Sequence, residues 1–434
     1  MNGGHGGWDV LVVGGGPAGL MASVAARSAG ARVLLLEKGA KLGRKLAISG
    51  GGRCNVTNAK PLPELMQNIP GNGRFLYSAL TRFSNQDVMA FFERLGIRLK
   101  EEDHGRVFPV SDKAVTVVRA LVHHVRDLGA EVRLNTPVRG LWTEPAGDGF
   151  VVRGVRVDTG VIPARAVVVA TGGCSVPATG STGDAYPWAR AVGHTIVDPY
   201  PVEVPLTSDA WFIRDRALQG ISLRDIALSV YDARGRRLTT EHGDLLFTHF
   251  GVSGPAALRA SHYVSIALRR EPGQVLRGEI DLTPAMDHEA WLETLAEARR
   301  AAPRKQLATV LARLLPDRLA AVVLRCAGED GTMQVANLSH AAAHCVVRQI
   351  KAFVVPVTGT LPLTQATVTG GGVSVKEIDP KTMMSKKCRG LFFAGEVMDV
   401  HAHTGGYNIT VAFSTGHAAG TSAAAYALSA AVRP

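Results

Sequence analysis

Three glycines and one acid near the start of the chain have the types and spacing of a nucleotide-binding turn. Gly14, Gly16 and Gly19 form G-x-G-x-x-G, and Glu37 follows at the distance of an acid that accepts both ribose hydroxyls. The first glycine permits the tight turn, the second lets the backbone approach a pyrophosphate, and the third allows close packing of helix on strand. We therefore expect this segment to bind a dinucleotide. Glu37 would repel a 2′-phosphate, which disfavours NADP and leaves NAD and FAD open.

A second glycine-rich segment extends the expected site. Residues 43–58 read GRKLAISGGGRCNVTN, in which Gly50, Gly51 and Gly52 are flanked by polar side chains. Such a backbone cradle suits a pyrophosphate or the rim of an aromatic ring system. Arg44, Lys45 and Arg53 add positive charge. A large, permanently held FAD requires this segment, whereas a simple NAD dehydrogenase does not.

Two later segments bring backbone and acids to the same edge of a sheet. The apolar run Ala166–Ala170 ends in Thr-Gly-Gly, where only backbone can approach a phosphate or flavin closely. The buried run Leu391–Ala394 delivers Gly395, Glu396 and Asp399 to the carboxyl edge, where open α/β sheets bind their ligands. The carboxylate of Asp399 is of a type that can hydrogen-bond the hydroxyls of the ribityl chain of FAD. The helix that opens at Asn408 would point its N-terminal N–H groups at the flavin ring.

Four side chains are candidates for proton transfer, which is needed only if a substrate atom must be protonated. They are His249, His401, His403 and Tyr407, and for each a purely structural role is the alternative. Two histidines at i and i+2 without further ligands do not make a metal site, so we expect no metal. Cys54 is either a thiol of lowered pKa beside Arg53 or a packing cysteine, and the tight loop favours packing.

The chain also resembles a known family. The segments SGGGRCNVTN, FTHFGVSGPAALRAS and TMMSK…GLFFAGEVMD…TGGYN are similar to those of bacterial flavoproteins of the aminoacetone-oxidase or BaiN/RdsA type, which are NAD(P)/FAD-dependent oxidoreductases. The resemblance runs from Asp9 to about Gly420 and implies FAD in a two-dinucleotide-binding-domain fold with an inserted β-barrel and a helical domain. Met384 replaces a glutamate usual in that family, and His401-Ala402-His403 replaces a stretch that is usually acidic and contains glycine.

The residues and the resemblance together define the expected FAD site. Its members lie in the glycine-rich turns, at strand ends or at the start of the last helix. They are Gly14, Gly16, Pro17, Ala18, Gly19, Glu37, Lys38, Gly43, Arg44, Lys45, Ser49, Gly50, Gly51, Arg53, Cys54, Asn55, Val138, Ala170, Thr171, Gly172, Gly173, Gly395, Glu396, Asp399, Gly406, Asn408 and Ile409.

The elements that must position these residues predict an α/β fold of three parts. A glutathione-reductase-like, Rossmann-type FAD domain is expected from residues 1–200 and 358–434. An inserted β-barrel-like substrate domain is expected from 201–286 and 351–357, and a small helical insert from 287–350. The apolar segment Asn408–Val432 contains several hydroxyl side chains and predicts a buried helix with a small-residue face rather than a membrane span.

Composition narrows the function classes. The chain has five cysteines and no C-x-x-C motif, which predicts neither a disulfide framework nor a redox dithiol. Because no signal peptide is recognisable in Met1–Trp8 either, we expect a cytoplasmic protein. The net charge of +11 suits an anionic cofactor. Without an RNA-binding motif we do not expect a nucleic-acid partner, and we expect no membrane partner. The sequence does not indicate the oligomeric state.

The leading hypothesis is therefore an FAD-dependent oxidoreductase that transfers hydride through flavin N5 to or from a small organic substrate. The family label suggests NAD(P)H-dependent reduction of an activated C=C bond. No second G-x-G-x-x-G exists, so NAD(P)H would bind only transiently. Amine or C–C bond oxidation, with O2 or a quinone as acceptor, is the alternative. A flavin-dependent RNA-modifying or RNA-binding protein and a flavin redox sensor without turnover are alternatives of other classes.

Overall fold

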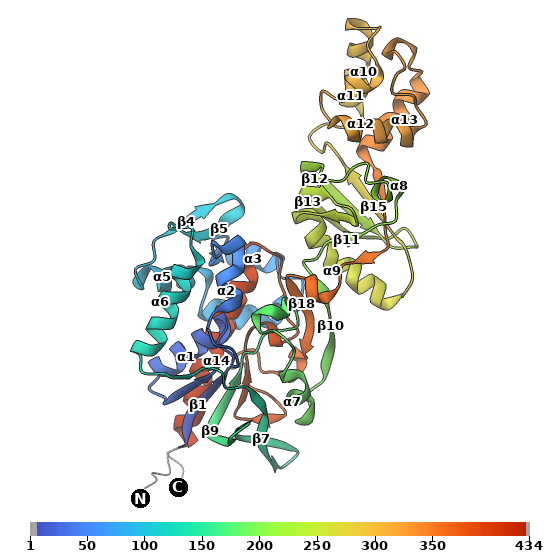
Figure 1. Ribbon diagram of the computed structural model, residues 1–434. Helices are drawn as coiled ribbons and strands as arrows, with labels where there is room; N and C mark the ends of the chain where they lie inside the picture. Colours follow the sequence, from blue (N-terminus) through green and yellow to red (C-terminus); the bar gives the residue numbers. More distant parts are fainter. Residues whose placement is uncertain (1–6, 431–434) are drawn as a thin grey trace, which may run out of the picture. The chain divides into compact units, whose positions relative to one another are not determined.

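The computed structural model describes residues 7–430 and divides the chain into two compact units (Figure 1). Unit 1 contains the residues up to Tyr200 and from Val368 onward, and unit 2 contains Pro201–Thr367. Each unit has its own hydrophobic core. Residues 1–6, part of the segment in which no signal peptide is recognised, lie outside the described residues.

A parallel sheet forms the centre of unit 1. Its strands are β20 (Leu391–Phe393), β9 (Gly160–Val169), β1 (Trp8–Val13), β2 (Val33–Leu36) and β6 (Glu131–Arg133), paired in that order. Strands β1, β2 and β20 and the second half of β9 are buried almost throughout, as expected for apolar runs covered on both faces. The predicted Rossmann-type α/β arrangement is confirmed.

Strand β9 is longer than the sequence suggests. The sequence pattern predicts two separate runs, Gly160–Pro163 and Ala166–Ala170, but the structure has one strand. Its first half pairs antiparallel with β8 (Gly149–Val157), which also pairs with β7 (Val138–Ala146), and its second half pairs parallel with β1. The hairpin thus continues directly into the central sheet.

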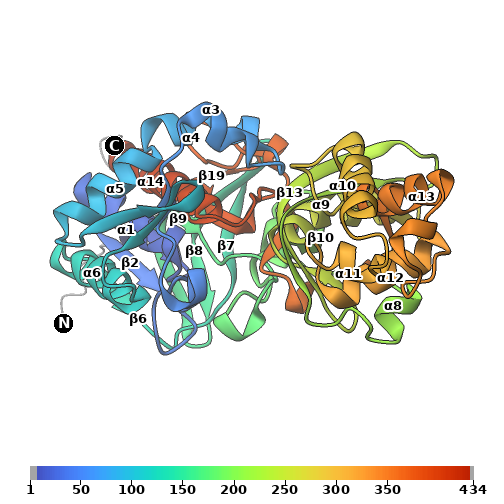
Figure 2. The ribbon, with the colours of Figure 1, turned by 90° about the horizontal axis from the view of Figure 1, so that it is seen from above.

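Two helices pack on each other across very small residues. Helix α14 (Tyr407–Ala430) lies against α1 (Pro17–Ser28), as seen in Figure 2. A Cβ at Gly416 or Gly420 would overlap backbone atoms of α1. The backbones therefore approach each other as closely as the small residues permit. Within the described residues, no helix is long and apolar enough to cross a membrane.

The other elements of unit 1 surround this centre. The sequence pattern predicts helices at Asn85–Leu95 and Ala114–Leu128, and both are present but end one residue earlier. It does not predict the three-stranded sheet that the structure has in the same region. The elements are α2 (Arg44–Ile48), β3 (Thr57–Asn58), α3 (Leu62–Gln67), α4 (Gly73–Arg82), α5 (Asn85–Arg94), β4 (Leu99–Glu102), β5 (Arg106–Pro109), α6 (Ala114–Asp127), α7 (Ala185–Ala191), β10 (Ile196–Val202), β18 (Val368–Val373) and β19 (Cys388–Arg389).

Unit 2 joins a seven-stranded antiparallel sheet to helices. The segment expected to form a barrel-like insert contains this sheet, whose strand order is β16-β15-β12-β13-β14-β11-β17. The elements are β11 (Leu206–Thr207), α8 (Trp211–Arg214), β12 (Ser222–Tyr231), β13 (Arg237–Phe247), β14 (Gly251–Ser253), α9 (Pro255–Arg270), β15 (Leu276–Asp281), α10 (His288–Ala301), α11 (Leu307–Leu311), α12 (Asp317–Ala327), α13 (His340–Lys351), β16 (Phe353–Val357) and β17 (Gly359–Thr360).

Candidate cofactor site

The carboxyl ends of four parallel strands meet in unit 1. Strands β1, β2, β9 and β20 are neighbours, and they are followed by Gly14, Glu37, Ala170 and Ala394. Each of these positions lies in a motif predicted to contact FAD. The fold therefore brings together segments that are hundreds of residues apart in the chain.

The first glycine-rich turn has the geometry that its spacing predicts. Gly14 has a φ of 103°, and a Cβ there would lie 2.5 Å from the carbonyl oxygen of Ala170. A Cβ at Gly19 would overlap the carbonyl oxygen of Gly14, so helix α1 packs directly on the turn. At Gly16 a Cβ would meet nothing within 4 Å, and Pro17 begins the helix. The space beside Gly16 suits a phosphate at the helix N-terminus.

The acid that follows β2 is held by the same turn. Glu37 accepts one hydrogen bond from the N–H of Gly15 (2.8 Å) and another from the N–H of Gly39 (2.7 Å). A carboxylate has about four lone-pair positions, so acceptor positions remain for ribose hydroxyls. The backbone bonds fix the carboxylate at the edge of the nucleotide turn.

The second glycine-rich segment forms a tight loop. Gly50 and Gly51 have φ values of 57° and 68°, and a Cβ at Gly50 would lie 2.9 Å from the N of Asn55. Cys54 also has a positive φ and is fully buried, and its burial raises the pKa of the thiol to about 12. Cys54 is therefore a packing cysteine, and the alternative of an activated thiol is wrong.

This loop is fastened to the start of α14. Asn58 donates from Nδ2 to the carbonyl oxygen of Gly405 (2.9 Å), and the hydroxyls of Thr57 and Thr410 lie 2.7 Å apart. A Cβ at Gly406 would overlap the carbonyl of Thr57. The second glycine-rich segment, residues 43–58, and the segment that leads into α14 thus form one structure around the N-terminus of α14.

Two buried polar atoms in these motifs lack a hydrogen-bond partner among the residues that the structure describes. They are Oδ1 of Asn55 and Oγ1 of Thr171. Buried polar atoms are nearly always paired, so each of these two atoms fits a contact with a ligand. These two atoms, the open space at Gly16 and the fixed carboxylate of Glu37 together fit FAD. The glycine-rich turn would hold the pyrophosphate of FAD, Glu37 would hold the ribose, and Asn55 would contact the flavin end. When bound, FAD would supply hydride chemistry at its flavin ring.

A partly buried ion pair joins two of the residues predicted to contact the cofactor. Nζ of Lys45 lies 2.6 Å from Oε2 of Glu396 and 2.8 Å from the hydroxyl of Ser175. Oε1 of Glu396 accepts from Ser175 Oγ (2.9 Å) and from the N–H of Thr369 (2.8 Å). Burial alone would raise the pKa of Glu396, but the Lys45 charge and these hydrogen bonds hold it below its ordinary value. Lys45 and Glu396 therefore clamp together four segments, which contain Lys45, Ser175, Thr369 and Glu396.

The remaining predicted cations have protein partners. Arg53 pairs with Glu102 (2.5 Å) and Asp112 (2.6 Å) and stacks on Phe108. Its positive charge, expected to face the cofactor, is thus balanced by two carboxylates. Arg44 donates to the carbonyl of Ala178 (2.5 Å), and Lys38 pairs with Asp184 (2.5 Å).

The candidate proton donors divide between the units. His401, His403 and Tyr407 are buried in unit 1, and Asn408 ties the loop before α14 by donating to the carbonyl of Ala402 (2.7 Å). His249 is exposed in unit 2, at the turn between β13 and β14. Three of the four candidates therefore belong to unit 1. Within the described residues, no group of three or more His, Cys, Asp or Glu side chains is arranged to hold a metal.

Three residues outside the predicted set support the site. A Cβ at Gly71 would overlap the ring of His401, and Asn72 donates from Nδ2 to Oδ2 of Asp399 (3.0 Å). Thr369 accepts at Oγ1 from the N–H of Cys174 (2.9 Å). The turn signal Pro-Gly-Asn-Gly at 70–73 marks the first two positions, but it does not indicate their partners.

The other predicted contact residues lie at the ends of the same elements. Val138 begins β7, Gly43 precedes α2, Ser49 accompanies the tight loop, Gly172 and Gly173 follow β9, and Ala18 and Ile409 lie in the first turns of α1 and α14. Contact of all these residues with FAD stays a prediction.

Comparisons with known proteins agree with a Rossmann-type fold. The HI0933-like protein Rossmann domain matches residues 8–422. A ribosomal RNA dihydrouridine synthase of Haemophilus influenzae is 33% identical over 94% of this chain and 96% of its own length. A 3-dehydro-bile acid delta(4,6)-reductase of Clostridium scindens is 29% identical over 95% of this chain and 98% of its own. A crystal structure of a 3-ketosteroid delta1-dehydrogenase from Sterolibacterium denitrificans shares the fold, with a TM-score of 0.53 at 14% identity, covering 96% of this chain and 99% of that one.

Fold and site therefore define an FAD-dependent oxidoreductase with a Rossmann-type FAD-binding domain. The chain belongs to the HI0933-like family, the flavoprotein family of the BaiN/RdsA type that its motifs resemble.

Proposed function

We propose that this protein uses FAD to reduce a carbon–carbon double bond conjugated to a carbonyl, and that the bond belongs to a uridine of ribosomal RNA. The proposal rests chiefly on the relative from Haemophilus influenzae, which is named for dihydrouridine formation in ribosomal RNA and aligns over nearly the full length of both chains. RNA, which the sequence alone did not lead us to expect as a partner, thereby becomes the leading candidate substrate.

The two relatives' names describe one type of chemistry. Dihydrouridine is uridine with its ring double bond saturated, and that bond is conjugated to a ring carbonyl. The bile-acid relative is named as a reductase of a 3-dehydro substrate, whose double bonds are conjugated to a ketone. In both cases a hydride adds to the carbon distant from the carbonyl and a proton adds to the carbon beside it.

The electron donor in this proposal is NAD(P)H. The balanced reaction converts NAD(P)H, a proton and uridine into NAD(P)+ and dihydrouridine. A second dinucleotide motif is absent from the sequence, so the donor would bind transiently and leave before RNA enters. His401, His403 and Tyr407 are the candidate sources of the proton because they lie together just before and at the start of α14.

A direct experiment supplies the purified protein with NADH or NADPH and with ribosomal RNA lacking dihydrouridine. Mass spectrometry of the digested nucleosides should show dihydrouridine only with protein and donor present. The Tyr407→Phe and His403→Gln variants should retain donor-dependent flavin bleaching, and loss of product formation by one of them would identify the proton source. Flavin that is bleached by the donor but forms no dihydrouridine would overturn the RNA assignment.

A dienone steroid is the second candidate substrate, favoured by the bile-acid relative. The same assay with a 3-oxo-4,6-diene bile acid in place of RNA tests it. Saturation of the steroid at a rate far above that of uridine would make this the function.

A further inference from the structure

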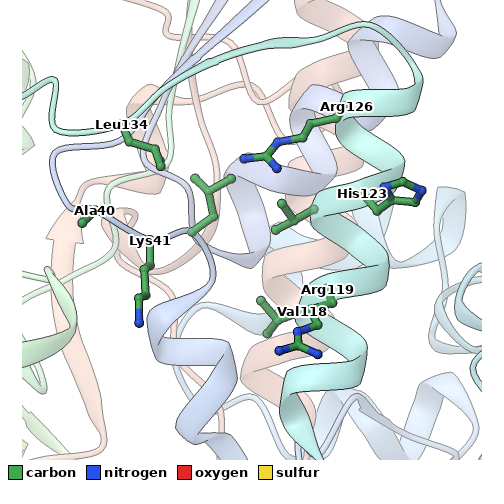
Figure 3. A pocket seen from close by; sticks show the side chains of 9 residues that line it. Ala40, Lys41, Val118, Arg119, His123, Arg126 and Leu134 are labelled. Carbon is green, nitrogen blue, oxygen red and sulfur yellow. The ribbon is translucent and has the colours of Figure 1, made fainter.

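Unit 1 contains a basic groove between the loop after β2 and helix α6. Its volume is about 530 Å³, which lies within the range of about 300–1,000 Å³ typical of ligand sites. Figure 3 shows side chains from the loop and from α6 on its two sides. The groove is lined by Ala40, Lys41, Leu42, Val118, Arg119, Val122, His123, Arg126 and Leu134.

The charges of this groove are of one sign. Lys41, Arg119 and Arg126 are exposed, and no carboxylate of residues 7–430 lies within ion-pair distance of them. His123 pairs with Asp127 (3.2 Å), which is not a lining residue. Figure 3 shows the Arg126 side chain extending from α6 toward Leu134, whereas His123 points away. The groove therefore presents three cations whose charge no neighbouring carboxylate balances.

The loop side of the groove is fixed in place. Gly43 has a φ of 69°, and a Cβ there would lie 2.8 Å from Cγ1 of Val118, so the loop packs closely on α6. The N–H of Gly43 donates to the carbonyl of Gly15 (2.8 Å). The same loop therefore forms one wall of the groove and supports the nucleotide turn.

We propose that this groove binds the phosphodiester backbone of the RNA substrate. The inference rests on the proposed function, and it adds a second contact region outside the cofactor site. Unpaired cations spaced along one helix face suit successive phosphates, because each contact releases condensed counterions. Leu42, Val118 and Leu134 offer an apolar floor to a ribose.

Charge and composition favour RNA over a small anion. Three cations spread along a groove of this size exceed what one phosphate requires, and most of the chain's net charge of +11 belongs to unit 1. The lining includes no aromatic ring of Phe, Tyr or Trp and no side-chain amide, so the groove has few groups for stacking or reading bases. It should therefore position RNA without selecting its sequence.

The test compares two double variants of the holoenzyme. Arg119→Ala/Arg126→Ala removes two groove cations, and Arg139→Ala/Arg153→Ala removes two surface cations that are already paired with Asp158 and Glu144. Both change the net charge equally. Fluorescence anisotropy with a labelled single-stranded RNA gives affinity at several salt concentrations. Equal FAD content and melting temperature show that both variants fold, and Arg119→Lys/Arg126→Lys provides a charge-retaining check.

The expected effect follows from counterion release. Each phosphate contact with single-stranded RNA contributes a slope of about 0.7 in log K against log salt, which is about fivefold in affinity at 0.1 M salt. The groove variant should therefore bind about 25-fold more weakly, with a slope smaller by about 1.4, and the lysine variant should bind nearly as wild type. The control variant should lose less than about threefold.

Two measurements separate this inference from the proposed function. If both double variants bind RNA alike, or if AMP at millimolar concentration displaces RNA completely, the groove is not an RNA site even when dihydrouridine is formed. If the groove variant alone loses affinity but the wild type forms no dihydrouridine, the groove inference stands and the proposed function fails. If both hold, the groove variant should show a raised KM for RNA and an unchanged kcat.

Discussion

Replacing Glu396 by glutamine should destabilise unit 1 although the new side chain has the same shape. The carboxylate of Glu396 joins Lys45, Ser175 and the backbone of Thr369, which belong to three separate segments. A glutamine at this position can keep the two acceptor contacts at its single oxygen. Its amide nitrogen would then face the Lys45 ammonium, donor against donor.

The magnitude follows from the burial of the pair. Side-chain exposures of 26% for Lys45 and 20% for Glu396 place the pair between a surface and a fully buried ion pair. A hydrogen bond to a charged group is worth about 1.5–3 kcal/mol, and breaking a buried pair costs about 3–5 kcal/mol. We expect a loss of about 2–3 kcal/mol. For a unit of this size, about 2 °C per kcal/mol, the melting temperature should fall by about 4–6 °C.

Scanning calorimetry with FAD bound measures this change, and Glu144→Gln is the matched control. Glu144 pairs with Arg153 at 2.7 Å, but both side chains are 50% exposed, so the control should shift the melting temperature by less than about 1 °C. Lys45→Met should destabilise as Glu396→Gln does, and the double variant should lose much less than the sum. Equal small shifts for Glu396→Gln and Glu144→Gln would refute the clamp.

Three further outcomes are expected. Gly19→Ala should weaken FAD binding at least tenfold in a fluorescence titration, because its Cβ would overlap the nucleotide turn. Gly140→Ala is the control, since a Cβ at Gly140 would meet open space and should leave FAD binding unchanged. Equal affinities of the two variants for FAD would contradict the packing argument. His417 stacks on Phe83 with 4.4 Å between the ring centroids, and its burial, opposed by the charge of Asp87, lowers the pKa of His417. The unfolded chain therefore takes up a proton at this histidine at higher pH than the folded chain does, and the free energy of unfolding falls below about pH 6.5. The melting temperature of His417→Gln should accordingly depend less on pH between 7 and 5 than that of the wild type. Cys54 should resist iodoacetamide in the native protein at pH 8 and react only after unfolding, whereas rapid native labelling at this site would contradict its burial.

The sequence predicted what depends on backbone geometry at short range. The structural roles of Gly14, Gly16 and Gly19 follow from their spacing in the sequence, because a tight turn between a strand and a helix can adopt few backbone conformations. The long α14 was foreseen as buried from its small residues and hydroxyls. Each of these features is local, so the sequence alone contains the necessary information.

What the sequence could not give is the partner of each charged side chain. Arg53 stands in a glycine-rich motif and was expected to face the cofactor, yet Glu102 and Asp112 of a small unforeseen sheet and its following loop take its charge. Lys45 and Glu396 were both assigned to the cofactor, and they bind each other across 351 residues. Long flexible side chains can reach several partners, so only the tertiary arrangement decides between them.

The same arrangement links cofactor binding to the stability of unit 1. Asn55 and Thr171, which carry unpartnered buried atoms, lie on segments that also fasten β9 and the start of α14. Leaving a buried polar atom unpaired costs about 1–3 kcal/mol, and a ligand that pairs both atoms recovers this free energy only in the folded state. Pairing of both atoms by FAD should therefore stabilise the folded arrangement of these distant segments, while Gly416 and Gly420 set how closely α14 can pack on α1 behind them.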